Sequence, residues 1–220
     1  KPFEGEVGGE LLETSVTYNV LDAMKQAQTE LLASSPYFVP GARGMAFLRG
    51  LRERGVKVTV MTNSLGSTDE PVVTIGYARY RVPMLKMGVE LYELSSQRVK
   101  RNKRLFHFGE SLGRLHAKLV VIDRRRVFVG SMNLDPRSAT INTEFGSVID
   151  SPQLAKELTR VIDLDRLQSA YRVELDDDDR VRWIGADEEG DAVFDSEPDV
   201  SMWLKFKTWL LSPLVPEDLL

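Results

Sequence analysis

The stretch that decides the fold covers residues 114–149 and reads RLHAKLVVIDRRRVFVGSMNLDPRSATINTEFGSVI. Its first apolar run predicts a strand over residues 115–122, and the polar residues 123–126 predict a tight turn. A return strand is expected over residues 127–130 and a further strand over residues 144–150. The stretch should therefore form a small β-unit, and the polar side chains along it are candidates for function.

His116 and Lys118 fall inside the first predicted strand. Because side chains alternate along a strand, both are expected on one face, and Asp123, of opposite parity, on the other. Burial of a lysine is costly unless an anion meets it, and a ligand phosphate is such an anion. Asp123 stands at the turn, where we expect its carboxylate to hydrogen-bond to backbone rather than to act in catalysis.

Three further residues with useful chemistry follow the return strand. Ser131 supplies a hydroxyl and Asn133 an amide, while Gly130 allows close approach of the backbone. Glu144 lies in a strand-like segment, where its carboxylate needs a partner. A carboxylate bonded to one imidazole nitrogen fixes the tautomer and makes the other nitrogen a better nucleophile or base.

Together these side chains suit phosphoryl transfer without a metal or another cofactor. A histidine attacks or protonates, a lysine and an asparagine neutralise the non-bridging oxygens, and a glutamate orients the histidine. The expected catalytic residues are His116, Lys118 and Glu144. The expected phosphate-binding residues are Lys118, Ser131 and Asn133, and the expected structural residues of the motif are Asp123 and Gly130.

The composition is that of a soluble globular domain. Of the 220 residues, 42% are hydrophobic and 28% charged, which excludes a disordered chain. The absence of Cys excludes a disulfide scaffold and a thiolate metal site. With two His, His107 and His116, a three-His metal site is excluded as well. No apolar run in the sequence is long enough to span a bilayer.

The net charge of −4 argues against a dedicated nucleic-acid binder. The charge is unevenly distributed, since residues 98–137 hold eleven Lys and Arg against three acids, whereas residues 163–199 hold fourteen acids against four Arg. A basic segment in an acidic protein is a candidate for binding phosphate groups or an anionic membrane surface. Two solvated faces that attract each other would give the same pattern.

The sequence before the central stretch alternates between helical and strand patterns, which indicates right-handed crossovers and a mainly parallel sheet. Helices are expected over residues 15–32, 43–54 and 71–87, and strands over residues 31–39, 56–61 and 89–94. Further on, a helix is expected over residues 152–167 and small strands over residues 171–175, 181–184 and 192–194. We expect one domain, residues 1–220, whose last part, 171–220, adds small strands and a closing helix.

The closing helix is expected over residues 202–211. One of its faces is apolar and the opposite face carries two lysines: Trp203, Phe206, Trp209 and Leu210 against Lys205 and Lys207. We expect the apolar face to pack in the core. Docking at a membrane interface would give the same pattern.

The pattern HxKx4D at residues 116–123, followed by GSxN at residues 130–133, resembles the HKD motif of the phospholipase D superfamily. Glu144 matches the downstream acid that pairs with the motif histidine in that family. The resemblance extends over most of the chain, including SPYFVP at residues 35–40 and the segment 77–92. The last residues, PEDLL at 216–220, resemble the C-terminus of bacterial cardiolipin synthases of the two-motif type, especially the C class.

The resemblance implies an α/β fold with the phospholipase D/nuclease-like mixed, mainly parallel sheet flanked by helices on both faces. Two-motif members carry one motif in each half, and both histidines line one active site. This chain carries one motif, because His107 is followed two residues later by Gly109 and not by Lys. It therefore resembles the C-terminal half of a longer protein. Its partner would be the N-terminal half or, as in one-motif members, a homodimer mate.

The resemblance further implies metal-independent phosphatidyl transfer through a phosphohistidine. The model reaction is cardiolipin synthesis from phosphatidylglycerol and a second phospholipid, which is phosphatidylglycerol or phosphatidylethanolamine. In two-motif members the histidine of the C-terminal half, here His116, is more often the general acid and base. The protein would act peripherally at the bacterial inner membrane, on its cytoplasmic side.

Three alternatives stay open at this point. Water as the acceptor would make the reaction hydrolysis to phosphatidic acid. A phosphodiesterase or nuclease of the same superfamily is the second alternative, although the net charge and the absence of aromatics among the basic residues count against nucleic acid. The third is a half that has no activity of its own.

Overall fold

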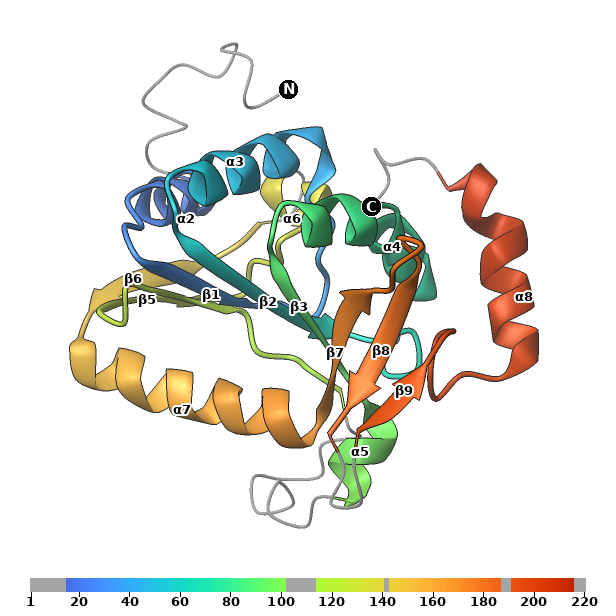
Figure 1. Cartoon of the computed structure of the whole chain (residues 1–220). Helices are drawn as coiled ribbons and strands as arrows, with labels where there is room; N and C mark the ends of the chain where they lie inside the picture. The colour runs from blue at the N-terminus through green and yellow to red at the C-terminus, as the bar shows by residue number, and fades with distance from the viewer. Residues whose placement is uncertain (1–14, 102–113, 141–142, 187–190, 216–220) are drawn as a thin grey trace.

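The computed structural model describes residues 15–101, 114–140, 143–186 and 191–215 (Figure 1). Its strands are β1 (Glu30–Ser34), β2 (Lys57–Asn63), β3 (Glu90–Leu94), β4 (Leu119–Ile122), β5 (Arg126–Gly130), β6 (Gly146–Asp150), β7 (Ala170–Leu175), β8 (Val181–Gly185) and β9 (Ala192–Phe194). Its helices are α2 (Val16–Lys25), α3 (Gly41–Glu53), α4 (Pro71–Lys86), α5 (Ser96–Arg101), α6 (Pro136–Thr140), α7 (Pro152–Gln168), α8 (Met202–Leu211) and the 3₁₀ helix η2 (Ser212–Leu214). All strands of the described part join one sheet in the order β6-β5-β4-β1-β2-β3-β7-β8-β9.

Helices cover both faces of the sheet (Figure 1). Residues of α2, α3 and α4 build the larger apolar core on one face, together with alternate strand residues such as Val60 and Leu91. On the opposite face, Ala155 and Ile162 of α7 lie in a second buried cluster with Met61. The prediction of a mixed α/β sheet between two helical layers is confirmed.

The prediction that the sheet is mainly parallel is wrong for the sheet as a whole. Within the described chain, β1–β2 and β2–β3 run parallel, while the other six neighbouring pairs are antiparallel. Parallel neighbours need a long crossover, which α3 and α4 provide in the first half. In the second half, short turns link β4 to β5 and β7 to β8, so these strands extend the parallel centre with antiparallel pairs.

The strand at the candidate site is shorter than the sequence predicts. β4 begins at Leu119, so His116 and Lys118 precede the strand instead of lying within it. β4 pairs with β1, whose last residue is Ser34. Pro36 follows shortly and offers no backbone N–H for a ladder, so the segment before Leu119 has no strand beside it on that side. Strand alternation therefore does not place His116 and Lys118.

Asp123 ties the β4–β5 turn to the start of β1. Its carboxylate accepts hydrogen bonds from three consecutive backbone N–H groups, those of Gln28 (3.0 Å), Thr29 (2.8 Å) and Glu30 (3.1 Å). Asp123 and Arg124 both have a φ of 52°, which is typical of tight hairpin turns. Burial opposes ionisation of the carboxyl, but the hydrogen bonds outweigh it and lower the pKa of Asp123. In the described structure Asp123 therefore serves as an acceptor of backbone hydrogen bonds.

The closing helix α8 has no buried residue, and Trp203 and Trp209 are 63% and 71% exposed. The prediction that its apolar face packs in the core is therefore wrong. α8 lies beside α4 at the margin of the molecule, and no layer of the described chain covers its outer face (Figure 1). None of the described helices is both long enough and apolar enough to cross a membrane.

We expect Asp123→Asn to lower the free energy of unfolding by about 1–3 kcal/mol at neutral pH, because an amide group replaces an acceptor oxygen among several N–H donors. The pKa of Asp123 is lower in the folded state than in the unfolded state, so its contribution is fully present above about pH 4. It is lost as the pH falls through the folded-state pKa. Urea unfolding between pH 7 and pH 3 should show a constant difference that shrinks at the acid end.

Asp177→Asn is the matched control, since Asp177 lies exposed in the acidic turn between β7 and β8. This substitution should leave the urea midpoint unchanged across the same pH range. A destabilisation by Asp123→Asn that persists undiminished at pH 3 would contradict the role of the ionised carboxylate.

Candidate active site

The predicted site residues gather at one edge of the sheet. β4 starts, β5 ends and β6 starts at this edge, because the three strands are antiparallel neighbours. His116 and Lys118 precede β4, Ser131 and Asn133 follow β5, and Glu144 precedes β6. The parallel strands also end here, since Ser34 of β1 pairs with Leu119 of β4. In open α/β sheets, ligands bind outside the carboxyl ends of the parallel strands.

Asn63, the last residue of β2, holds the backbone next to His116. Its Oδ1 accepts a hydrogen bond from the N–H of Leu115 (2.9 Å), and its Nδ2 donates to the carbonyl of Leu115 (3.2 Å). The amide is buried, and Ser67 donates to the same Oδ1 at 3.2 Å. One side chain therefore fixes both backbone groups of the residue before His116.

The side chain of His116 is exposed at this edge. Within the described residues its imidazole makes no hydrogen bond, while its backbone carbonyl accepts one from Nζ of Lys118 at 3.2 Å. The ring is therefore accessible to a ligand phosphate or to a group from another chain.

Lys118 is half-buried at the edge of the sheet and not enclosed in the core. Burial lowers the pKa of its ammonium, and the carboxylates of Glu144, Asp69 and Asp135 act in the opposite direction. The charge of Lys118 is therefore influenced by acidic side chains of the protein itself. In the parts of the chain that the structure describes, no group of three or more His, Asp and Glu side chains is arranged to hold a metal ion.

Ser131 and Glu144 are paired. The Ser131 hydroxyl donates a hydrogen bond to the Glu144 carboxylate and accepts one from the N–H of Phe145 at 3.0 Å. The hydroxyl that we expect to bind phosphate therefore holds the carboxylate that we expect to orient His116. A hydrogen bond between Glu144 and His116 is not formed in the described structure, and this pairing stays a prediction.

Gly130 lies where the backbones of β5 and β6 come close together. A side-chain carbon on Gly130 would lie 2.8 Å from the Cα of Gly146, a separation that real Cβ atoms essentially never show. The close approach at Gly130 is therefore made to the neighbouring strand.

Asn133 is positioned through the residue that follows it. The N–H of Leu134 donates to the Ser35 hydroxyl (3.0 Å), and the Leu134 carbonyl accepts from the N–H of Val39 (2.9 Å). Oδ1 of Asn133 is buried without a hydrogen-bond partner among the described residues. An unmet buried polar atom is costly, so this amide is available to a ligand, and rotation of the amide exchanges its oxygen and nitrogen.

Tyr37 and Asp69 lie at the same edge. The Tyr37 hydroxyl donates to Asp69 at 2.9 Å, and burial together with this hydrogen bond raises the pKa of Tyr37 to about 12. Asp69 and Asn63 are the two residues here that our sequence analysis misses. Both follow the apolar run of β2, and polar residues after a predicted parallel strand are the signal that would have indicated them.

A family model described as "Cardiolipin synthase, PLD-like domain" matches residues 20–166. All seven residues of the predicted site fall within this match.

Curated relatives extend the similarity to the full chain. Cardiolipin synthase C of Escherichia coli (strain K12) is 36% identical over 223 residues, which cover 100% of this chain and 46% of the relative. An uncharacterized protein of Helicobacter pylori (strain J99) is 36% identical and covers 89% of this chain and 38% of the relative. Cardiolipin synthase B of Shigella flexneri is 30% identical and covers 59% and 27%. The chain spans less than half the length of these relatives.

Two solved structures share the fold. The crystal structure of Nuc, a phospholipase D family member from Salmonella typhimurium, has a TM-score of 0.55 at 23% identity and covers 74% of this chain and 93% of that chain. The phosphatidylserine synthase of Haemophilus influenzae Rd KW20 has a TM-score of 0.56 at 15% identity and covers 97% and 46%. Identities this low establish the shared fold alone.

The family match runs from α2 into α7 and includes the sheet edge at which His116 lies. The same edge carries the polar groups that approach from β2, β5 and β6. This chain therefore belongs to the phospholipase D-like domain family of the cardiolipin synthases.

Proposed function

We propose that the chain forms one half of the catalytic centre of an enzyme that transfers phosphatidyl groups between phospholipids. The observation that carries this proposal is the sheet edge, where the exposed imidazole of His116 lies on the same short segment as the ammonium of Lys118. Relatives named cardiolipin synthases support phospholipid substrates. The proposed acceptor is phosphatidylglycerol, whose headgroup carries free hydroxyls, and the proposed donor is phosphatidylglycerol or phosphatidylethanolamine. The proposed place of action is the bacterial inner membrane, with the protein bound peripherally on the cytoplasmic side.

The proposed reaction has two steps and uses two histidines. In the first step a nucleophilic histidine attacks the phosphorus of the donor lipid, the bond to the oxygen of the headgroup alcohol (glycerol or ethanolamine) breaks, and the second histidine gives that oxygen a proton. In the second step the second histidine removes a proton from the acceptor hydroxyl. The acceptor oxygen then attacks the phosphorus and releases the nucleophile. Protons and bonds balance without a cofactor.

We assign the acid and base role to His116. The other histidine would come from the N-terminal half of the same protein or from a second copy, because the motif occurs once in this chain. Lys118 and Asn133 would neutralise the non-bridging oxygens of the transition state. Glu144, which Ser131 holds in place, would orient His116 in the completed site.

His116→Ala, made in the protein that includes the N-terminal half, is expected to reduce cardiolipin formation by about a thousandfold or more. The thermal midpoint should stay unchanged, because the imidazole is exposed and makes no hydrogen bond in the described structure. Products from phosphatidylglycerol vesicles, with and without phosphatidylethanolamine, are identified by mass spectrometry. Gln153→Ala, exposed on α7, serves as the control. Wild-type rates in His116→Ala would refute the assignment, and phosphatidic acid as the main product would indicate hydrolysis.

Activity is expected to persist in excess chelator, because histidine, lysine and amide groups supply the proton transfers and the charge that the reaction needs. The same product assay is run with and without the chelator. Activity that disappears and returns only with a divalent metal would refute the metal-independent mechanism.

Asn63→Ala is expected to lower kcat about tenfold or more with a smaller change in KM, because it releases the backbone that positions His116. Amide hydrogen exchange at Leu115 should become faster in the same variant. Thr59→Val is the matched control, since it removes the hydrogen bond of Thr59 to Glu90 at the other end of β2. Faster exchange at Leu115 with an unchanged kcat would show that this backbone does not position the reacting group.

A further inference from the structure

Helix α8 presents a broad apolar surface to solvent. Its five most exposed apolar members are Met202 (79%), Trp203 (63%), Phe206 (50%), Trp209 (71%) and Leu210 (54%). Single exposed apolar residues are ordinary on a protein surface, but a contiguous patch that includes two tryptophans marks an interaction site. We call these five residues the α8 face.

The aromatic rings of the α8 face form a continuous row along the helix. Trp203 stacks on Phe206 with 6.0 Å between ring centroids, and Phe206 contacts Trp209 at 6.1 Å. The rings contact each other instead of the core, so the row faces outward over the length of the helix.

Two lysines border the α8 face. A helix turns by about 100° per residue, so Lys205 and Lys207 lie on either side of Phe206, at the margins of the outward row and not on the face directly opposite it. Nζ of Lys207 lies 5.4 Å from the centre of the Trp203 ring, and α8 contains no acidic residue. An apolar strip with a cation along each margin complements a bilayer surface, where tails accept the strip and phosphates accept the cations.

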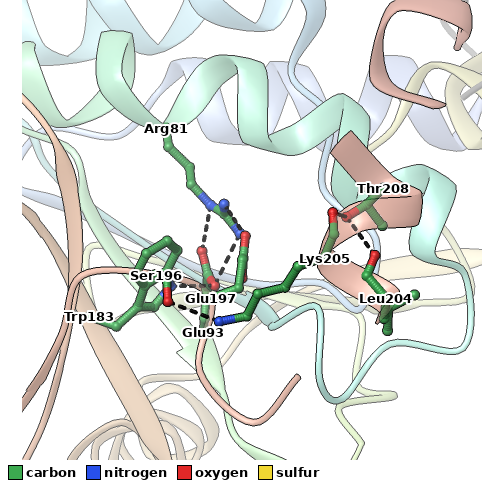
Figure 2. Close-up of polar contacts among 8 residues, drawn as sticks. All are labelled: Arg81, Glu93, Trp183, Ser196, Glu197, Leu204, Lys205 and Thr208. Carbon is green, nitrogen blue, oxygen red and sulfur yellow. Dashed lines mark hydrogen bonds and ion pairs between the residues drawn. The ribbon is translucent and has the colours of Figure 1, made fainter. Parts of the chain in front are cut away.

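The N-terminal side of α8 is anchored to the buried interior (Figure 2). Glu197, just before the helix, accepts a hydrogen bond from Arg81 at 2.5 Å, and Arg81 also donates to Glu93 at 2.8 Å and 3.2 Å. Trp183 of β8 donates to the same Glu93 at 2.8 Å. A buried ion pair thereby fixes the irregular segment that leads from β9 into α8 and with it the start of the helix.

Further contacts hold both ends of α8. Lys205 reaches back to the Ser196 hydroxyl at 2.9 Å (Figure 2). Beyond the C-terminal end, Arg79 of α4 donates to the carbonyls of Ser212 (2.6 Å) and Val215 (2.8 Å). α8 is therefore held in a defined orientation although its outer face is uncovered.

The anchor of α8 adjoins the candidate active site. Asp199 lies two residues before Ser201, the N-cap residue of α8. Its carboxylate accepts a hydrogen bond from the Tyr171 hydroxyl at 3.2 Å. The backbone of Asp199 lies so close to Gly66 that a side-chain carbon on that glycine would be 2.9 Å from the Asp199 carbonyl oxygen. Gly66 belongs to the loop after β2, which also carries Asp69, whose charge acts on Lys118.

We propose that the α8 face docks the protein on a phospholipid bilayer that contains anionic lipid, with Lys205 and Lys207 at the level of the lipid phosphates. The choice of a bilayer as partner rests on the proposed function, in which the substrates are membrane lipids. Tryptophan is the side chain typical of membrane–water interfaces, and paired marginal lysines have no role in burying the strip against an apolar protein surface. Docking through α8 would bring the loop shared with the site to the bilayer.

Flotation of the 220-residue chain with vesicles tests this proposal. Vesicles of equal parts phosphatidylglycerol and phosphatidylcholine should bind the chain, and the variant Trp203→Ser/Phe206→Ser/Trp209→Ser should partition at least tenfold less. The matched control replaces exposed apolar residues on α2 and α7, as Tyr18→Ser/Val161→Ser, and should bind like the unaltered chain. Lys205→Gln and Lys207→Gln should each weaken binding to these vesicles about fivefold and leave binding to pure phosphatidylcholine unchanged.

Quenching by lipids with brominated tails gives an independent readout of depth. Trp203 and Trp209 should be quenched on binding, whereas the buried Trp183 should not. Circular dichroism and thermal unfolding confirm that each variant is folded before its binding is measured.

Equal binding by the α8 variant and the α2/α7 control would overturn the proposal. The proposal would also be overturned if the unaltered chain did not bind vesicles and the α8 variant lost a protein contact instead. That contact would be a dimer seen by analytical ultracentrifugation or binding to the separately produced N-terminal half. These outcomes are separable from failure of the proposed function. Vesicle binding is measured without turnover. If the chain binds vesicles but the complete protein forms no product, the proposed function is refuted and the docking proposal is not.

Discussion

The carboxylate of Asp123 fastens the antiparallel part of the sheet to its parallel centre. By accepting hydrogen bonds from three consecutive backbone N–H groups, two just before β1 and one from its first residue, it fixes where the β4–β5 hairpin meets β1. The pairing of Ser34 with Leu119 at the other end of these strands follows from that register. A shift of the β1–β4 register by one residue would turn every side chain of β4 to the opposite face. The hydrogen bonds of Asp123, at the far end of these strands, therefore help to determine the geometry at the site.

At the site itself the chain is irregular, and side-chain hydrogen bonds hold the backbone in place of the hydrogen bonds between strands. Asn63 holds Leu115, and Ser35 holds Leu134, each through hydrogen bonds to backbone. The segments that carry His116 and Asn133 are therefore irregular but fixed by the ends of β1 and β2. Reactive groups on short irregular segments supported by a rigid sheet are common in enzymes, because such segments can approach a ligand that a strand could not.

The C-terminal part is joined to this centre by a buried ion pair. Burial raises the pKa of Glu93, and the guanidinium of Arg81 opposes that rise. Burying two charges is costly, but each of them has a further hydrogen-bond partner, since Trp183 donates to Glu93 and Arg81 donates to Glu197. The pair links α4, β3 and β8 to the segment before α8. The loop after β2 then connects both regions, with Asp69 toward the site and Gly66 against Asp199.

The sequence by itself determined the helices and strands that have strong local patterns, and the identity of the polar residues at the candidate site. It also indicated the role of Asp123, because an acid at a tight turn has few uses besides accepting backbone hydrogen bonds. Tertiary structure alone decided the antiparallel pairing of the outer strands, the start of β4 at Leu119 and the parts played by Asn63 and Asp69. These features depend on contacts between residues far apart in the chain, and local periodicity does not reveal such contacts. The same holds for α8, since an amphipathic pattern states that a helix has an apolar face but not whether another layer of the protein covers it.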